Sequence, residues 1–259
     1  MNVVVFLAGI ADPKWPLSAV STDVVKARAD NHVALSPFDE AALETAMKIR
    51  DGWPGTRLTV AMIGGPESEI LLRKVAAYRV DRVARIDART LSPWDSRALA
   101  ARLAATLAEL DAGADLILIG REFGDCDAGG LPPCLAATLG WPFFGLTQHA
   151  EWDGECLSLL REQGSIEEKA SVTGPLVASV TNDRRNRLRH PLMKNVMEAK
   201  RMNIVTVTPP KVGASRVSLA EICGIAAATR EVACRVLDGP LDAQVAELAA
   251  FLGPWSARP

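Results

Sequence analysis

The sequence predicts an α/β protein with a doubly wound, mainly parallel sheet that carries helices on both faces. Two observations lead to this fold class. Strand-like runs such as VVVFLAG (3–9) and, after its Asp115, ADLILIG (114–120) are continuously apolar, which is typical of strands that are buried on both faces. Segments with helical periodicity separate these runs, and such alternation favours parallel strands joined by crossover helices.

The remaining core elements follow from the same two patterns. Further strands are expected at 57–65, 82–86 and 174–181. Helices are expected at 38–51, 66–78, 95–110 and 128–140. The first of these has the clearest start, because Ser36 is a natural N-cap, Pro37 suits the first helical position and Asp39 completes a capping box.

The second half of the chain departs from this rhythm. Residues 149–174 alternate around a WDG turn, which predicts an antiparallel hairpin added to an edge of the sheet. A densely basic stretch follows Thr181, and a helix is expected at 241–252. We therefore divide the chain into a core of residues 1–190 and an extended C-terminal arm of residues 191–259.

Composition excludes several classes of function. The net charge of −2 provides no field that would attract nucleic acid or anionic lipid. No signal peptide or membrane-spanning run is recognised, so a cytoplasmic location is expected. The five cysteines form no CxxC pair, and no His/Cys cluster has metal spacing. The three histidines are scattered, so neither a metal site nor catalytic acid–base or nucleophilic residues are expected.

Glycine-rich strand ends mark the expected ligand site. Ligands of open parallel sheets bind at the carboxyl ends of the strands, and here Gly9, Gly64 and Gly120 follow three of them. The loop at 120–130 also carries Asp125 and Asp127, which could hydrogen-bond hydroxyl groups. Such glycines can be purely structural, and no GxGxxG or P-loop pattern is present. A stand-alone adenine-nucleotide-binding protein is therefore one hypothesis.

A second candidate surface lies in the basic stretch at 184–201. Its apolar residues stand at helical neighbour spacings: Leu192, Met193, Val196 and Met197. An apolar surface flanked by Arg and Lys suits docking to an acidic partner. The same residues could instead pack on the domain.

Taken together, four segments resemble the beta (small) subunit of electron-transfer flavoprotein, over roughly residues 1–208. NVVVFLAGIADP is similar to the family's opening VxVxVKxVxDP, and LSPFDEAALETAMKIRD to NPFDExAxEEAxxLK. GREFGDCDAGGLPPCLAATLGWP resembles GxxxxDxDxxQxGPxLAxxLGWP, the most specific of the four. SVTNDRRNRLRHPLMKNVMEAKR resembles TxxLRLNEPRYPSLPGIMKAKK with one residue deleted.

The resemblance implies a Rossmann-like, adenine-nucleotide-binding fold and a heterodimer with an alpha subunit that holds most of an FAD. Pro13 and Phe38 stand where the family covers the flavin ring from the beta side. Locally, Phe38 has another explanation, a hydrophobic staple beside the helix cap. An electron carrier of this kind passes electrons from a flavin-dependent dehydrogenase to a quinone-linked or other acceptor and is not itself an enzyme.

The resemblance also implies an AMP-type pocket. Its residues would be Phe6, Ser36, Pro37, Phe38, Asp39, Gly64, Gly120, Asp125, Asp127, Ala128, Gly129, Gly130 and Leu131. Several of them depart from the family pattern, since Phe6 replaces a small residue and Gly129, Gly130 and Leu131 replace polar ones. AMP, the second FAD of a bifurcating branch, or Phe6 itself could fill the pocket, and a member that has lost its nucleotide would serve as a scaffold.

Partner docking is expected at Leu192, Met193 and Met197. Met193 stands where the family uses a leucine to anchor the dehydrogenase, and methionine can fill the same kind of pocket with a more adaptable shape. This changed anchor and the additional arginines around it predict a specialised dehydrogenase partner.

Overall fold

The computed structural model describes residues 1–14, 33–87, 94–110, 113–208 and 234–256 of the chain. The chain separates into two compact units, residues 1–223 and 224–259. The first unit holds the sheet and its covering helices, and the second holds a single described helix.

Seven parallel strands form the central sheet of the first unit, in the order β12-β5-β4-β1-β6-β11-β7. Their bounds are β1 (Asn2–Leu7), β4 (Arg57–Ile63), β5 (Arg82–Ile86), β6 (Leu116–Gly120), β7 (Phe143–Thr147), β11 (Leu176–Val180) and β12 (Val205–Val207). On one side of β1 the sheet continues through β4, β5 and β12. On its other side it continues through β6, β11 and β7. The order therefore reverses between β1 and β6, which is where open α/β sheets bind ligands.

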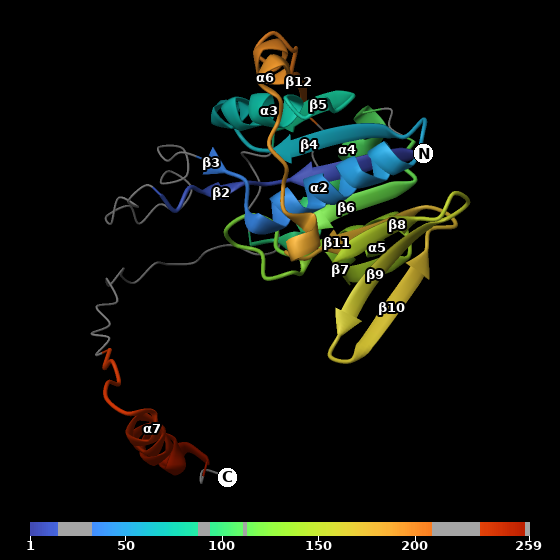
Figure 1. Ribbon diagram of the computed structural model, residues 1–259. Coiled ribbons are helices and arrows are strands. Elements are labelled where there is room, and N and C mark those ends of the chain that lie inside the picture. Colours follow the sequence, from blue (N-terminus) through green and yellow to red (C-terminus); the bar gives the residue numbers. More distant parts are fainter. Residues whose placement is uncertain (15–32, 88–93, 111–112, 209–233, 257–259) are drawn as a thin grey trace. The chain divides into compact units, whose positions relative to one another are not determined.

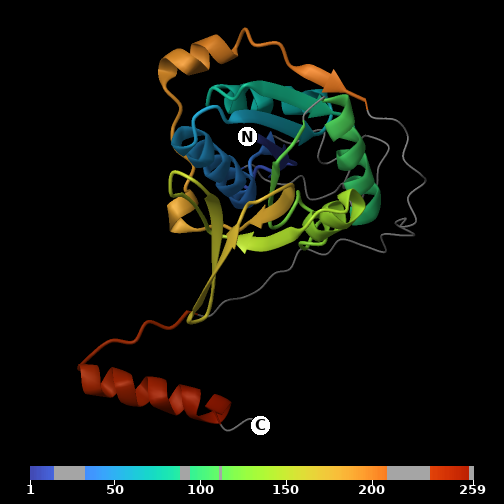
Figure 2. The same cartoon turned by 90° about the vertical axis from the view of Figure 1, so that its right-hand side faces the viewer.

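Helices cover both faces of this sheet, so the predicted doubly wound fold is confirmed (Figures 1 and 2). One face carries α2 (Pro37–Gly52) and α3 (Glu69–Ala76), and the other carries α4 (Ser96–Glu109) and α5 (Leu131–Leu139). The side chains of β1 alternate between the two cores: Val5 and Leu7 face α2, whereas Val4 and Phe6 face α4 and α5. Burial on both faces explains why the strand sequence is apolar without interruption.

Helix boundaries follow their capping residues. Ser36 caps α2 with the predicted capping box, and Asp95 caps α4 by accepting from the Ala98 amide at 3.0 Å. The helix expected from Pro66 begins as a short 3₁₀ turn, η1 (Pro66–Ser68), before α3. The helix expected from Ala128 begins only at Leu131, because Gly129 has a φ of +93°, outside the helical region.

Residues 149–171 form an antiparallel sheet of their own. Its strands are β8 (His149–Trp152), β9 (Leu157–Gln163) and β10 (Ile166–Ser171), joined in the order β10-β9-β8. The antiparallel prediction is confirmed, but its expected place as an edge addition to the main sheet is wrong. The buried side chains of β9 instead join the core beneath α2, and Trp152 stacks on Trp53 at the end of α2 with centroids 4.0 Å apart.

The basic stretch forms η2 (Arg184–Asn186) and α6 (Met193–Ala199), which lead to β12. Strand β12 belongs to the arm predicted from the sequence, yet it pairs with β5 and so extends the main sheet. Two short strands, β2 (Ile10–Ala11) and β3 (Val33–Ala34), pair antiparallel beside the end of β1. These five elements, and β7, were not predicted as helix or strand.

The described part of the second unit ends in α7 (Leu241–Ser256), which confirms the expected terminal helix and extends it by a turn. Among the helices of the described residues, none has the length and apolar character needed to cross a membrane.

Candidate functional site

Three segments meet at the carboxyl ends of β1 and β6, where the strand order reverses. They are the residues that follow β1, the first turn of α2 and the loop that follows β6 (Figure 1). Six of the predicted site residues lie together at this end of the sheet: Gly9, Ser36, Phe38, Asp39, Gly120 and Asp125.

Asp39 joins two of these segments through one buried carboxylate. Its side chain is 0 % exposed and accepts hydrogen bonds from the amides of Gly9 at 3.0 Å, Ser36 at 3.1 Å and Ala8 at 3.4 Å. The Ser36 hydroxyl accepts from the Asp39 amide at 2.9 Å. Burial raises the pKa of Asp39, and these hydrogen bonds oppose that rise. The carboxylate therefore fixes the start of α2 against the end of β1.

Gly120 allows the same helix start to lie on the end of β6. A Cβ at this position would stand 2.9 Å from the Cβ of Phe38 and 3.1 Å from its carbonyl carbon. The Phe38 ring is half-buried, and the guanidinium of Arg121 lies 4.7 Å from the ring centroid. The sequence did not point to Arg121, although its place beside Gly120 was a usable signal.

The loop after β6 folds around Asp127. This carboxylate accepts from the amides of Gly130 at 2.9 Å, Leu131 at 3.2 Å and Phe123 at 3.2 Å, and from the Ser96 hydroxyl at 3.4 Å. Pro132 and Pro133 follow in the first turn of α5, and proline has no amide hydrogen. Two residues of the predicted AMP-type pocket, Gly130 and Leu131, therefore already donate their amides to Asp127.

Other predicted pocket residues occupy different environments. The Phe6 side chain is 0 % exposed within the core on the α4 and α5 face. The carbonyl of Gly64 accepts from Arg85 at 3.3 Å, and Asp125 accepts from the Ala11 amide at 3.3 Å. The exposed residues of the predicted pocket and ring wall are Pro13, Pro37, Asp125, Ala128 and Gly130, while Gly129 is half-buried.

The predicted docking residues lie on the surface. Leu192, Met193 and Met197 are 71 %, 76 % and 56 % exposed, at the start and along one side of α6. Val196 instead packs against the core. We call residues 183–199 the docking segment.

Helix α2 holds this docking segment through one stripe of side chains: Glu40, Glu44, Lys48 and Asp51. Glu44 accepts from the Arg189 guanidinium at 2.7 Å and from the Arg189 amide at 3.1 Å, with its own side chain 4 % exposed. Lys48 donates to the carbonyl of Arg185, and Asp51 accepts from Arg189. Residues three and four apart share one helix face, so Glu44, Lys48 and Asp51 all meet the segment.

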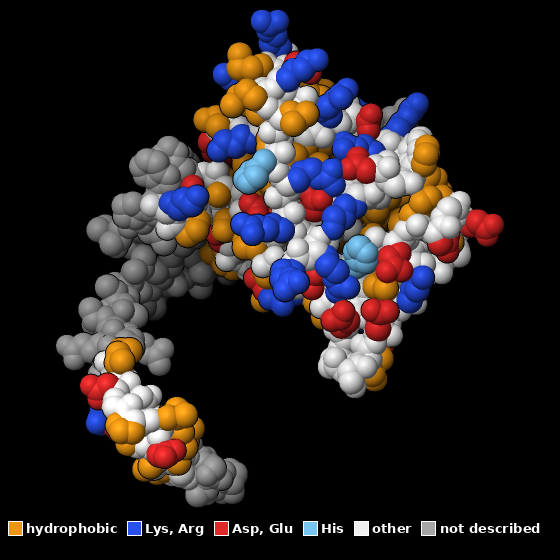
Figure 3. Space-filling model, in the orientation of Figure 1, with side chains coloured by type: hydrophobic (Ala, Val, Ile, Leu, Met, Phe, Trp, Pro, Cys, Tyr) orange, Lys and Arg blue, Asp and Glu red, His pale blue; other side chains and the backbone are white. Residues whose placement is uncertain are grey.

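Charge on this face is mixed but rich in cations, as Figure 3 shows over α2 and the docking segment. Partial burial acts to raise the pKa of Asp51, but hydrogen bonds from Arg189 and Arg50 outweigh it and lower that pKa. The hydrogen bond to Glu44 raises the pKa of Arg189 above its usual range. Burial raises the pKa of Glu40, opposed by the charges of Arg187 and Lys14.

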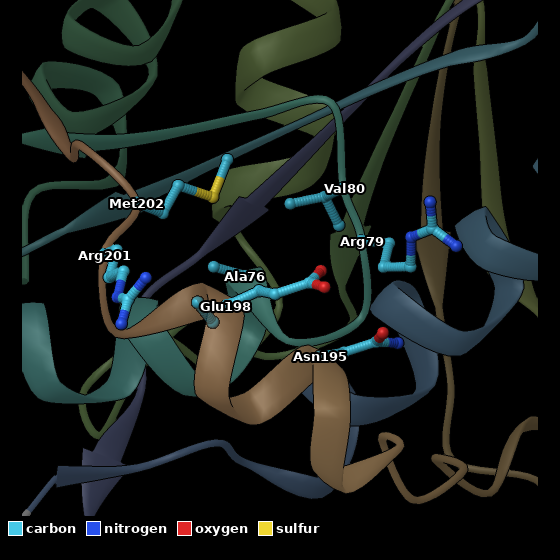
Figure 4. A pocket seen from close by; sticks show the side chains of 8 residues that line it. Ala76, Arg79, Val80, Asn195, Glu198, Arg201 and Met202 are labelled. Carbon is cyan, nitrogen blue, oxygen red and sulfur yellow. The ribbon is translucent and has the colours of Figure 1, made fainter.

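A separate cavity of about 460 Å³ lies between α6 and the end of α3. It is lined by Ala76, Arg79, Val80, Asn195, Glu198, Ala199, Arg201 and Met202. Figure 4 shows Glu198 and Arg201 coming from the α6 side, and Arg79 and Val80 from the loop after α3. None of these residues belongs to the edge where β1 and β6 end. In the part of the chain that the structure describes, no group of His, Cys, Asp and Glu has the arrangement of a metal site.

Comparisons with known proteins agree on one family. The family model described as electron transfer flavoprotein domain matches residues 23–212. The chain is 29 % identical over 181 residues to an electron transfer flavoprotein subunit beta of Bradyrhizobium diazoefficiens, covering 70 % of each chain. It is 26 % identical over 222 residues to the subunit beta of Megasphaera elsdenii, covering 83 % of this chain and 80 % of that one. A mitochondrial subunit beta of Oryza sativa is 29 % identical over 68 % of this chain and 70 % of its own.

The Glu44–Arg189 contact gives a first prediction. Glu44→Gln keeps the shape of the side chain but removes the charge, so the free energy of unfolding should fall by about 1.5–3 kcal/mol. Trypsin should then cut the docking segment faster, at Arg187 and Lys194. The matched control is Glu109→Gln at an exposed position on the other face of the sheet, where both measurements should stay at the wild-type value. Equal cleavage rates in all three proteins would contradict the assigned contact.

The pKa of Asp51 gives a second prediction. A carboxyl whose pKa is lower in the folded chain than in the unfolded chain stabilises the fold above the unfolded value, about 3.9, and this stabilisation is lost as pH falls through the folded value. Arg189→Gln removes the main donor, so the pKa of Asp51 should rise and the loss of stability in acid should become smaller.

Carboxyl-carbon NMR titration measures this shift. Asp153 is the internal control, because backbone hydrogen bonds from Cys156 and Glu155 lower its pKa. A shift at Asp153 equal to that at Asp51, or no shift at either, would argue against the ion pair.

Proposed function

The chain belongs to the electron transfer flavoprotein family, and from this premise we propose that it is the beta subunit of a two-chain electron carrier. Its FAD, shared with an alpha subunit, receives electrons from a flavin-dependent dehydrogenase and passes them to a quinone-linked or other acceptor. The observation that carries the proposal is the half-buried Phe38 ring at the reversal point of the sheet.

The residues at this edge fit a flavin. FAD supplies the redox chemistry when bound, and the protein supplies orientation and electrostatics. Phe38 offers an apolar face to a planar ring, while Asp39 and Gly120 hold the backbone on which that face depends. Pro13 lies exposed just after β2 and adds apolar surface to the same edge. These residues move no proton and form no covalent bond.

In the AMP-type pocket we propose that the side chains of Phe6 and Asp127 take the place of AMP. Phe6 fills core space on the α4 and α5 face, and Asp127 takes the amides that a phosphate would use. A phosphate in this loop would have to displace a carboxylate that accepts four hydrogen bonds. The geometry therefore disfavours both AMP and a second FAD.

Electron donors dock, in this proposal, on the exposed side chains of Leu192, Met193 and Met197. Exposed apolar side chains rimmed by cations suit a partner with an apolar pocket and an acidic border. Arg184, Arg187 and Lys194 supply such a rim. The dehydrogenase that fits this surface would differ from one that accepts the leucine of the family pattern.

The C-terminal arm contributes a further contact surface for the alpha subunit. Within α7, Leu241, Val245, Leu248 and Leu252 are 73 %, 58 %, 47 % and 49 % exposed at spacings of three and four residues. Such a stripe is the kind of helix face that packs against another protein surface. The cytoplasmic location expected from the sequence stays a prediction.

A stand-alone nucleotide-binding protein remains the alternative function. The glycine-rich strand ends favour it, whereas the occupied amides of the loop after β6 count against it. ATP-dependent thermal stabilisation of the chain on its own would support this alternative.

The test is to co-express the chain with an electron transfer flavoprotein subunit alpha of the same organism, purify the complex, denature it and measure the released flavin and adenine nucleotides by chromatography. We expect one FAD and no AMP per heterodimer. One AMP per heterodimer would overturn the role given to Asp127, and two FAD would indicate a bifurcating carrier. Chains that fail to associate, with no flavin present, would contradict the proposed function.

A further inference from the structure

We infer that Arg121 raises the reduction potential of the flavin bordered by Phe38, and that Glu122 limits this effect. The inference rests on the proposed function, because it needs a flavin at the Phe38 ring. It assigns to the beta chain itself a pair of charged residues that tune the cofactor.

The backbone holds Arg121 at the ring. Its amide donates to the carbonyl of Val180 at 2.8 Å, so the first residue after β6 is still attached to the sheet. The preceding Gly120 lets the first turn of α2 approach within contact distance of the strand end. Two independent constraints thus bring the Arg121 guanidinium to 4.7 Å from the centroid of the Phe38 ring.

Glu122 is the immediate counter-charge of this guanidinium. The two side chains form an ion pair and are 44 % and 39 % exposed, so both reach the surface beside the ring. Arg121 and Glu122 are adjacent residues of the same loop. Replacing one side chain therefore leaves unchanged the backbone that positions the other. Asp125 lies farther along the loop and is turned to the Ala11 amide.

The electrostatic consequence follows from the sign of each charge. An electron taken from a reduced donor, which is thereby oxidised, adds one negative charge to the flavin ring. A nearby permanent cation stabilises that charge, and a nearby carboxylate opposes it. Arg121 therefore favours the reduced flavin, Glu122 disfavours it, and the two neutral variants should shift the potential in opposite directions.

The test is a potentiometric titration of the FAD-loaded heterodimer with dithionite and mediator dyes. In Arg121→Gln the equilibrium constant for adding the first electron should fall by about tenfold, which is 59 mV for one electron. In Glu122→Gln it should rise. Arg121→Lys keeps the charge and loses the planar stacking, so its shift should be smaller than that of Arg121→Gln.

Arg57→Gln is the matched control. Arg57 is exposed at the start of β4, at the amino ends of the strands and so opposite to the candidate site. Its potential should equal that of the wild type. If flavin is bound, potential shifts of the same sign in Arg121→Gln and Glu122→Gln, or no shift in either variant, would overturn this inference. The proposed function would then still stand. Absence of flavin from the wild-type heterodimer would instead overturn the proposed function and, with it, this inference.

Discussion

The carboxylate of Asp39 is the interaction on which the candidate site depends. It is completely buried, and a charge in such a place is costly unless hydrogen bonds satisfy it. Here the donors are the amides at the end of β1 and at the cap of α2, which belong to separate segments. One side chain therefore fixes the direction in which α2 leaves the edge of the sheet, and Phe38 stands next to it in the sequence.

Helix α2 then carries this geometry to the docking segment. Glu44 is six positions after Phe38, which corresponds to about 9 Å along a helix. Glu44 in turn holds Arg189, so the surface proposed to meet an electron donor is attached to the same rigid element as the proposed flavin wall. This helix therefore fixes the proposed flavin wall and the proposed docking surface relative to each other.

Much of the fold could be predicted because its causes are local or periodic. The apolar strands, the capping box at Ser36 and Asp39, and the caps of α2 and α4 all follow from nearby residues. The second sheet was misplaced because pairing between strands depends on which core the buried face of β9 covers. Strand β12 was missed because three residues give no periodicity, and its pairing with β5 is a long-range contact.

The candidate site could likewise be predicted only in part. Glycines at strand ends and the spacing of Asp125 and Asp127 located the loop, but not the direction of its side chains. Asp127 was expected to meet a ligand hydroxyl, whereas it accepts from amides of its own loop. The contact of Arg121 with Phe38 joins residues 83 positions apart, so the place of Arg121 beside Gly120 marked it as a residue of this strand end but not as a neighbour of the ring.

The proposed position of Phe38 beside the flavin can be tested directly by fluorescence. An indole in contact with a flavin quenches its emission by electron transfer, so Phe38→Trp should shorten the flavin fluorescence lifetime of the heterodimer. Phe143→Trp is the control, on the edge strand β7 at a residue that is 41 % exposed. The account predicts a shorter lifetime in Phe38→Trp and the wild-type lifetime in the control. An unchanged lifetime in Phe38→Trp, with flavin bound, would contradict it.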